Sequence, residues 1–144
     1  MSEMPKLNLG AGYDGAPGYV RADIAGQPDI TCDARALPFS DGAFSEIKAH
    51  HVLEHIERRD LVRVMNECHR VLAPEGVLDI EVPIFPSEDA MADPTHVSFF
   101  VSGTFDYFRE DQPLRDLYGI QPWRIVGKER LSFNSILHVS MAKI

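Results

Sequence analysis

The sequence is poor in cysteine, in basic residues and in long apolar runs. Two cysteines, Cys32 and Cys68, stand in 144 residues, too few for a disulfide framework and typical of reduced thiols in a cytoplasmic protein. Lysine and arginine number 14 against 22 acidic residues, a net charge of −8. This balance predicts no nucleic-acid partner and no anionic membrane. No apolar run approaches the roughly 18 residues of a membrane-spanning helix, and residues 1–6 do not resemble a secretory signal.

The composition that is present is that of an ordinary globular protein. Hydrophobic residues make up 44% and charged residues 25% of the chain, which excludes disordered and fibrous classes. There is no internal repeat, low-complexity segment or linker. We therefore expect one domain over residues 1–144, long enough to bury a core but too short for a separate substrate domain.

Apolar residues that alternate with polar ones predict a series of short strands. The expected strands cover residues 6–9, 19–24, 29–33, 43–49, 77–82, 123–126 and 136–141, and the last two could pair as a hairpin. An apolar stripe with a period of 3.6 residues predicts a helix over 60–72, with Asp60 as its N-cap. Strands that alternate with turns and a helix favour an α/β sheet.

Two features at strand ends suggest a nucleoside site. Gly10-Ala11-Gly12 follows the first strand, where glycines let the backbone approach a ligand and free N–H groups can hold an anion. Asp23 ends the second strand and is suited to accept hydrogen bonds from both hydroxyls of a ribose. Either feature alone is more often a simple turn or a cap, so the argument depends on the pair.

Longer motifs follow in a fixed order along residues 6–83. They are LNLGAG (7–12), PGYVRADI (17–24), DARALPFSDGAF (33–44), HVLEHI (51–56) and HRVLAPEGVL (69–78). Together they resemble the class I S-adenosylmethionine-dependent methyltransferases of the type 11 kind. The resemblance implies a minimal, Rossmann-like, doubly wound sheet, mostly parallel with a late antiparallel hairpin. It also implies a cytoplasmic enzyme that transfers a methyl group from S-adenosylmethionine to an acceptor.

The same resemblance implies which residues hold the cofactor. They are Gly10, Ala11, Gly12, Asp23, Asp33, Ala34, Leu37, His50 and His51. The first three would line the methionine part, and the next aspartate would bind the ribose hydroxyls. The second aspartate would face the adenine amino group, and the alanine and leucine after it would pack beside the ring. The two histidines would border the sulfonium.

The chain departs from the family pattern between Gly12 and Asp23. The usual fold has a helix there, whereas this short segment contains Gly15, Pro17 and Gly18, which disfavour a helix. We expect that helix to be absent or reduced. A helix N-terminus normally supplies part of the anion site, so we expect weaker cofactor binding.

Residues 84–120 are expected to form the acceptor side of the site. They hold over half of the aromatic residues, and Asp93-Pro94-Thr95-His96 resembles a D-P-x-H block of the family. His96 could orient or deprotonate an acceptor hydroxyl or amine, with Asp93 orienting His96. An equal alternative is that the aromatics pack on the sheet and His96 ties the loop to it. We expect a small-molecule or sugar-like acceptor, and the aromatic segment is compatible with a homodimer contact.

Two other functions stay open on the sequence alone. The first is a methyltransferase-like binding or partner subunit without catalysis. The second is a zinc peptidase, because His51, Glu54 and His55 fit the H-x-x-E-H pattern, with two histidine ligands and a glutamate base. So short a pattern arises by chance, and this one lies within the methyltransferase motif. We favour local hydrogen bonds for Glu54 and His55 and expect no metal.

Overall fold

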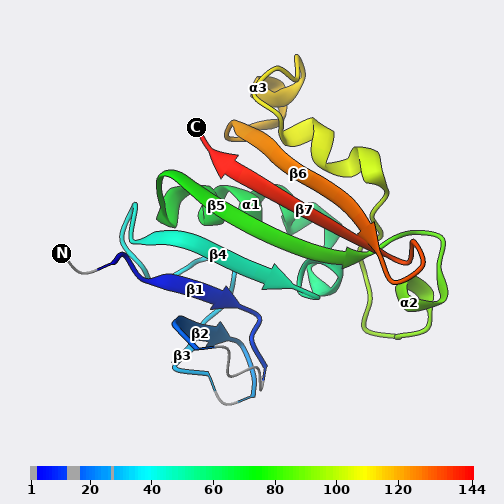
Figure 1. Ribbon diagram of the computed structural model, residues 1–144, viewed down its shortest axis with the longest axis horizontal. Helices are drawn as coiled ribbons and strands as arrows, with labels where there is room; N and C mark the ends of the chain where they lie inside the picture. The colour runs from blue at the N-terminus through cyan, green and yellow to red at the C-terminus, as the bar shows by residue number, and fades with distance from the viewer. Residues whose placement is uncertain (1–2, 13–16, 27) are drawn as a thin grey trace.

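The computed structural model describes residues 3–12, 17–26 and 28–144, and its centre is a seven-stranded sheet (Figure 1). The strands are β1 (Lys6–Leu9), β2 (Tyr19–Asp23), β3 (Ile30–Thr31), β4 (Phe44–His50), β5 (Leu72–Pro83), β6 (Trp123–Leu131) and β7 (Ile136–Lys143). Their order in the sheet is β3-β2-β1-β4-β5-β7-β6. The first five strands are parallel, and β7 runs antiparallel between β5 and β6. This arrangement confirms the predicted fold class.

The longest helix is α1 (Leu61–Val71), and it is one residue shorter at each end than the sequence predicts. Asp60 makes no side-chain cap bond. Its carboxylate instead accepts a hydrogen bond from Arg35 at 3.4 Å, so Asp60 occupies the predicted N-cap position without capping the helix through its side chain. Because β5 follows α1 directly, its start at Leu72 also precedes the predicted one. The Pro74-Glu75-Gly76 segment, which lies between the predicted helix and the predicted strand, is a bulge inside β5, with Glu75 at φ 65°.

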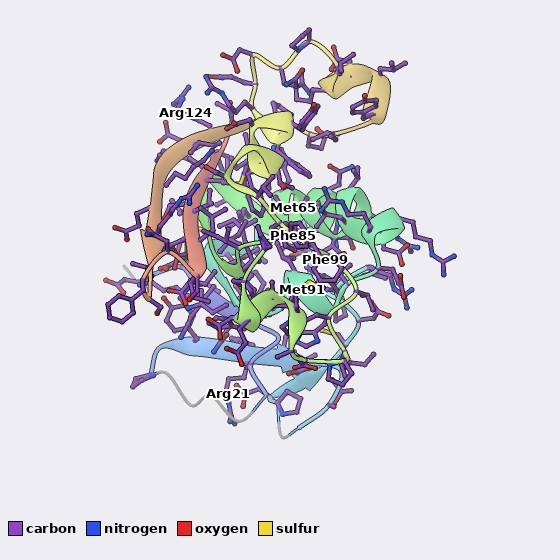
Figure 2. The ribbon with its side chains drawn as sticks, turned by 90° about the vertical axis from the view of Figure 1, so that its right-hand side faces the viewer. Arg21, Met65, Phe85, Met91, Phe99 and Arg124 are labelled. Atoms are coloured by element: carbon purple, nitrogen blue, oxygen red, sulfur yellow. The ribbon has the colours of Figure 1, made fainter. Side chains whose placement is uncertain are left out.

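One face of the sheet carries the helices and the core. Leu78, Ile80 and Val82 of β5 are buried on this face, and α1 contributes Val64 and Met65. In both views the helices lie on the same side of the sheet, and the sheet edge in Figure 2 makes this plain. Burying side chains of this size stabilises the fold by about 1.5–3 kcal/mol each, so this one-sided core carries most of the stability.

The other face of the sheet is polar. The outward positions alternate with the core positions in β4, β5 and β7, as expected for a sheet with one solvated face. They include Glu46, Lys48, His50, Asp79, Glu81, His138 and Ser140. Within the described ranges, no helix covers this face in either view. We call it the open face.

The segment after β5 has short helical turns instead of a long helix. They are α2 (Glu88–Met91), a 3-10 helix (Ser102–Phe108) and α3 (Arg115–Tyr118). Phe100, Phe105 and Phe108 are buried in the core, so part of the aromatic segment serves packing. Phe85 and Phe99 are exposed, with ring centroids 5.8 Å apart. No helix in the described part of the chain is long and apolar enough to cross a membrane.

The predicted loss of the first crossover helix falls partly on residues 13–16, which lie outside the described residues. The described residues on either side, at 12 and 17–18, form turns. Two further 3-10 turns, Leu53–His55 and Arg58–Asp60, connect β4 to α1. These turns and the glycine turn after β1 meet at the carboxyl edge of the parallel strands, where ligands bind in open α/β sheets.

Candidate functional site

A cavity of about 540 Å³ opens at the carboxyl ends of the parallel strands. Its volume is typical of a small-molecule site. The residues that line it are Leu9, Gly10, Asp23, Ile24, Cys32, Asp33, Ala34, Arg35, His51, Val52, His55, Ile56, Glu57 and Asp60. Five of the predicted cofactor residues are in this set: Gly10, Asp23, Asp33, Ala34 and His51. The structure therefore brings together residues from all four strand ends that the motifs marked.

The glycine turn after β1 is held tightly against β2 and against the turn after β4. Gly10 has φ 66°, and a Cβ there would lie 2.2 Å from a methyl group of Val52, so only glycine fits. The Gly10 N–H donates to the Ala22 carbonyl at 2.8 Å, and the Gly12 N–H donates to Asp23 Oδ2 at 2.6 Å. The N–H groups of Gly10 and Gly12, which we predicted to be available to an anion, therefore already form hydrogen bonds that hold the turn in place.

Asp23 joins the turn to the end of β2. Its Oδ1 accepts from the Ile24 N–H at 2.6 Å, and its Oδ2 accepts from Gly12. The carboxylate also lines the cavity. Each carboxylate oxygen has more than one lone pair, so the same group can accept from a ligand hydroxyl while it orders the turn.

A chain of charges follows at the cavity's outer wall. Arg35 Nη2 lies 2.7 Å from Asp33 Oδ2, and Arg35 Nη1 lies 3.4 Å from Asp60 Oδ2. Hydrogen bonds from Arg35 lower the pKa of Asp33 below its ordinary value. Asp23 and Glu57 add further carboxylates to the wall. Acidic groups therefore outnumber cationic ones around the cavity, which favours a positively charged ligand.

His51 and Glu54 form a polar pair at the inner wall. His51 has φ 59°, and its Nδ1 lies 3.7 Å from Glu54 Oε2. The interaction with Glu54 raises the pKa of His51 above its usual value, so the charged imidazolium is favoured. Glu54 is 2% exposed, and its Oε1 has no hydrogen-bond partner among the described residues. An unpaired buried acceptor next to a cavity residue marks a place where a further polar group can bind.

Four residues of the predicted cofactor set do not line the cavity: Ala11, Gly12, Leu37 and His50. Ala11 and Leu37 are buried, and the Leu37 N–H donates to Glu67 on α1 at 2.9 Å. His50 lies on the open face, where its Nε2 is 2.7 Å from Asp79 Oδ2. β4 ends at His50, and His51 follows it with φ 59°. Glu81 Oε2 lies 3.6 Å from His50 Nδ1 and 3.5 Å from His51 Nε2, so the two histidines share one carboxylate although only His51 lines the cavity.

The predicted acceptor-side pair, His96 and Asp93, lies behind the cavity wall. The His96 ring packs on His55 with centroids 4.9 Å apart, and His55 lines the cavity. His96 Nδ1 faces the Ala90 carbonyl at 3.0 Å. Hydrogen bonds from Thr95 lower the pKa of Asp93. The structure therefore connects His96 to the cavity only through His55.

Sequence reasoning missed several residues that line the cavity, among them Ile24, Cys32, Arg35, Val52, His55, Ile56, Glu57 and Asp60. Arg35 could have been found, because it follows Asp33 at a spacing that suits a turn with an ion pair. Ile24 and Cys32 directly follow β2 and β3, and the rest lie in or beside the two 3-10 turns, which carry no periodic signal. Burial and a nearby Asp23 charge raise the pKa of the Cys32 thiol, so Cys32 is no activated nucleophile.

The zinc-peptidase pattern does not assemble. Leu53–His55 is a 3-10 turn, and His51 precedes it with a left-handed backbone. The two histidines of the pattern therefore do not lie one turn apart on an α-helix. Two clusters of three ligand-type side chains occur in the described part of the chain, and neither combines His51 with His55.

Comparison with known proteins agrees with this geometry. The family model described as "Methyltransferase domain" matches residues 11–80. The fold is similar to the PH0226 protein from Pyrococcus horikoshii OT3, with a TM-score of 0.70 at 17% identity, covering 99% of this chain and 83% of that one. It is also similar to a SAM-dependent methyltransferase from Archaeoglobus fulgidus, with a TM-score of 0.69 at 15% identity, covering 96% and 86%. At such identities the likeness shows the fold.

The sheet order, the cavity at its carboxyl edge and the family match define a class of protein. It is the class I S-adenosylmethionine-dependent methyltransferases, with a Rossmann-like sheet. Within that class, the chain is similar to the type 11 methyltransferases, whose family model matches residues 11–80, just under half of the chain.

A curated relative corrects one expectation from the sequence. The chain is 29% identical over 129 residues to the tRNA N(3)-methylcytidine methyltransferase Mettl2 of Drosophila melanogaster. The match covers 81% of this chain, which spans 38% of the relative's length. The relative's substrate is a nucleic acid, so the prediction of a small-molecule acceptor and no nucleic acid is wrong. That prediction used the net charge of the whole chain, which does not report where the arginines gather.

Proposed function

We propose that the protein transfers a methyl group from S-adenosylmethionine to a base of an RNA. The observation that carries the proposal is the acidic cavity at the strand ends, which continues at Arg35 into an arginine-lined groove beside α1. The cavity supplies a site for a cationic nucleoside cofactor. The groove supplies positive charge for a phosphate backbone.

The residues present fit this cofactor. Gly10 lines the cavity, and the lack of a side chain lets the end of β1 pack against Val52 at the cavity wall. Asp23 offers carboxylate oxygens to a ribose diol, and Ile24 with Ala34 offers an apolar surface to a flat base. S-adenosylmethionine, when bound, supplies a methyl group on a cationic sulfur that is a good leaving group.

The residues of this chain then align the acceptor with the methyl group, exclude water from the site and bind a proton. Alignment in a dry site can supply several kcal/mol of barrier lowering on its own. His51 faces the cavity with Glu54 behind it, so this pair can hold a proton at His51 Nδ1. We keep His96 as a positioning residue, because its ring packs on the cavity residue His55.

Residues 84–120 supply a surface that suits a base. Phe85 and Phe99 are exposed and tilted against each other, on the helix side of the sheet in Figure 2, and Met91 of α2 is also exposed. Unstacked RNA bases stack on such aromatic side chains. Arg58 donates to the Phe99 carbonyl at 2.9 Å, which fixes this surface to the turn that borders the cavity.

The arginine groove contains Arg35, Arg59, Arg63 and Arg70. Arg35 and Arg70 form ion pairs with carboxylates, whereas Arg59, in the Arg58–Asp60 turn, and Arg63, on α1, are exposed. Arginine side chains contact phosphate oxygens and position a strand without reading its sequence. A strand that follows this groove would bring a flipped base to the cavity past Arg35.

Cofactor binding is tested by calorimetric titration of the full chain with S-adenosylmethionine and its demethylated product. We expect Asp23→Asn to weaken binding by about 10-fold or more, since a hydrogen bond to a charged group contributes about 1.5–3 kcal/mol. The control is Asp29→Asn, an exposed carboxylate that pairs with Arg21 away from the cavity. Equal affinity in the two variants, or no heat with the wild type, contradicts the proposal.

Acceptor class is tested with methyl-labelled cofactor and total tRNA. We expect label in the RNA, and we expect the double variant Arg59→Glu, Arg63→Glu to lose most of it while binding the cofactor as the wild type does. The control is Arg130→Glu, an exposed arginine on β6. Bound cofactor with unlabelled RNA would favour the non-catalytic partner subunit instead.

A further inference from the structure

Four side chains with metal-binding chemistry meet on the open face, outside the cofactor cavity. They are His50 on β4, Asp79 and Glu81 on β5, and His138 on β7. Strand pairing places His50 opposite Glu81, and Glu81 opposite His138. Asp79 is two residues from Glu81 on the same strand and so shares its face. The positions of these four residues are therefore set by three neighbouring strands of the sheet and not by a loop.

Three of these residues bring donor atoms close enough to share one ion, and Asp79 contacts both histidines. Asp79 Oδ2 lies 2.7 Å from His50 Nε2, and Asp79 Oδ1 lies 2.6 Å from His138 Nε2. One donor atom each from His50, Glu81 and His138 lies within 4.8 Å of the others. Each of these side chains is about a quarter exposed, so an ion can reach them from solvent.

A second set of contacts holds the donors in place. Glu129 Oε1 lies 3.0 Å from His138 Nδ1, and the Ser140 hydroxyl donates to Asp79 Oδ1 at 2.9 Å. A carboxylate on the far nitrogen of a ligating histidine fixes the ring and raises its basicity, as in many metal sites. Glu129 is opposite His138 in the β6–β7 pairing, so this partner is also set by the sheet.

The donor set identifies the class of ion. Two imidazoles and two carboxylates suit Zn²⁺ and similar divalent transition metals, whereas Mg²⁺ and Ca²⁺ prefer oxygen ligands alone. Two carboxylates also balance the charge of a divalent cation. Carboxylates predominate around these donors. Strand pairing places the cation Lys48 opposite Asp79, whereas Asp79, Glu81 and Glu129 all belong to this cluster.

We propose that His50, Asp79, Glu81 and His138 form a binding site for a divalent transition-metal ion, with Zn²⁺ the best fit. The ion would replace the two short histidine–Asp79 hydrogen bonds and fasten β4, β5 and β7 to one another. This site does not depend on the proposed methyl transfer. It adjoins the cofactor cavity, because Glu81 Oε2 lies 3.6 Å from His50 Nδ1 and 3.5 Å from Nε2 of the cavity residue His51.

The test is titration of the chelator-treated full chain with Zn²⁺, and with Co²⁺ as a spectroscopic probe. We expect one ion per chain, a rise in the thermal unfolding midpoint and the visible absorption of four-coordinate Co²⁺. His138→Gln should weaken Zn²⁺ binding by more than about 100-fold, because losing an outer partner of a metal ligand already costs about 10–100-fold.

The control is His55→Gln, which removes a ligand from the other three-residue cluster, Glu54, His55 and His96. We expect this variant to bind Zn²⁺ as the wild type does. X-ray absorption of the Zn²⁺-loaded wild type should show two imidazoles, and this measurement needs no variant to fold. No saturable binding, an unchanged affinity in His138→Gln, or loss in His55→Gln would each overturn the assignment.

Discussion

Whether a predicted residue lines the cavity depends on where the strand beside it ends. Gly10, Asp23 and Asp33 follow the strands that end at the cavity, and sequence alone located them. His50 and His51 were placed together because both follow the predicted fourth strand, but β4 extends through His50, whose side chain pairs with Asp79 on the open face, and only His51 lines the cavity. Which N–H groups stay free could not be predicted, because the Ala22 carbonyl and the Asp23 carboxylate that engage them belong to another strand.

At the same scale, one ion pair fastens the segment after β3 to α1. Glu67 accepts from the Leu37 N–H at 2.9 Å and from Arg70 Nε at 2.6 Å, and Arg70 donates to the Phe39 carbonyl. The hydrogen bond from Arg70 lowers the pKa of Glu67 below its ordinary value of 4.5. A carboxyl with a lowered folded-state pKa stabilises the fold above its unfolded value and loses that contribution as the pH falls.

We therefore expect the wild type to lose stability below pH 4.5 more steeply than Glu67→Gln. At neutral pH the variant should be less stable by about 1 kcal/mol, since the pair is partly exposed. Denaturant unfolding over a series of pH values measures both effects. The control is Glu75→Gln on the exposed bulge of β5, and parallel pH curves for wild type and Glu67→Gln would refute the role of the pair.

At the scale of elements, local patterns located the strands and the longest helix but not all their ends. Alternation in 44–50 and the apolar stripe in 61–71 are strong signals, and both elements formed there. β5 starts earlier than predicted because its Pro74–Gly76 segment bulges and continues pairing with β4. The turns in 84–120 have no period, so only tertiary packing of phenylalanines defines them. The sequence predicted a late antiparallel hairpin, but the insertion of β7 between β5 and β6 is a long-range property that alternation does not show.

At the scale of the whole molecule, the net charge does not show how charged residues are distributed. A net charge of −8 excluded nucleic acid only under the assumption of an even charge distribution. In the folded chain the carboxylates gather at the cavity and on the open face, and arginines gather in one groove. The polar alternate positions of β4 and β5 are visible in the sequence, and they indicate a sheet with one solvated face. The prediction of a single domain over 1–144 stays a prediction.

The one-sided core makes the contact between the late hairpin and α1 a determinant of global stability. Trp123, the single tryptophan, begins β6, is fully buried, and packs edge-on against His69 of α1 with ring centroids 5.1 Å apart. His69 Nε2 in turn faces the Pro122 carbonyl at 3.0 Å.

We expect Trp123→Ala to lower the free energy of unfolding by about 3–5 kcal/mol, a large share of the stability of a typical domain. The matched control is Phe133→Ala at the exposed β6–β7 turn, which should change it by less than about 0.5 kcal/mol. Urea unfolding followed by circular dichroism gives both values, and similar midpoints for the two variants would show that the hairpin is not part of the cooperative core.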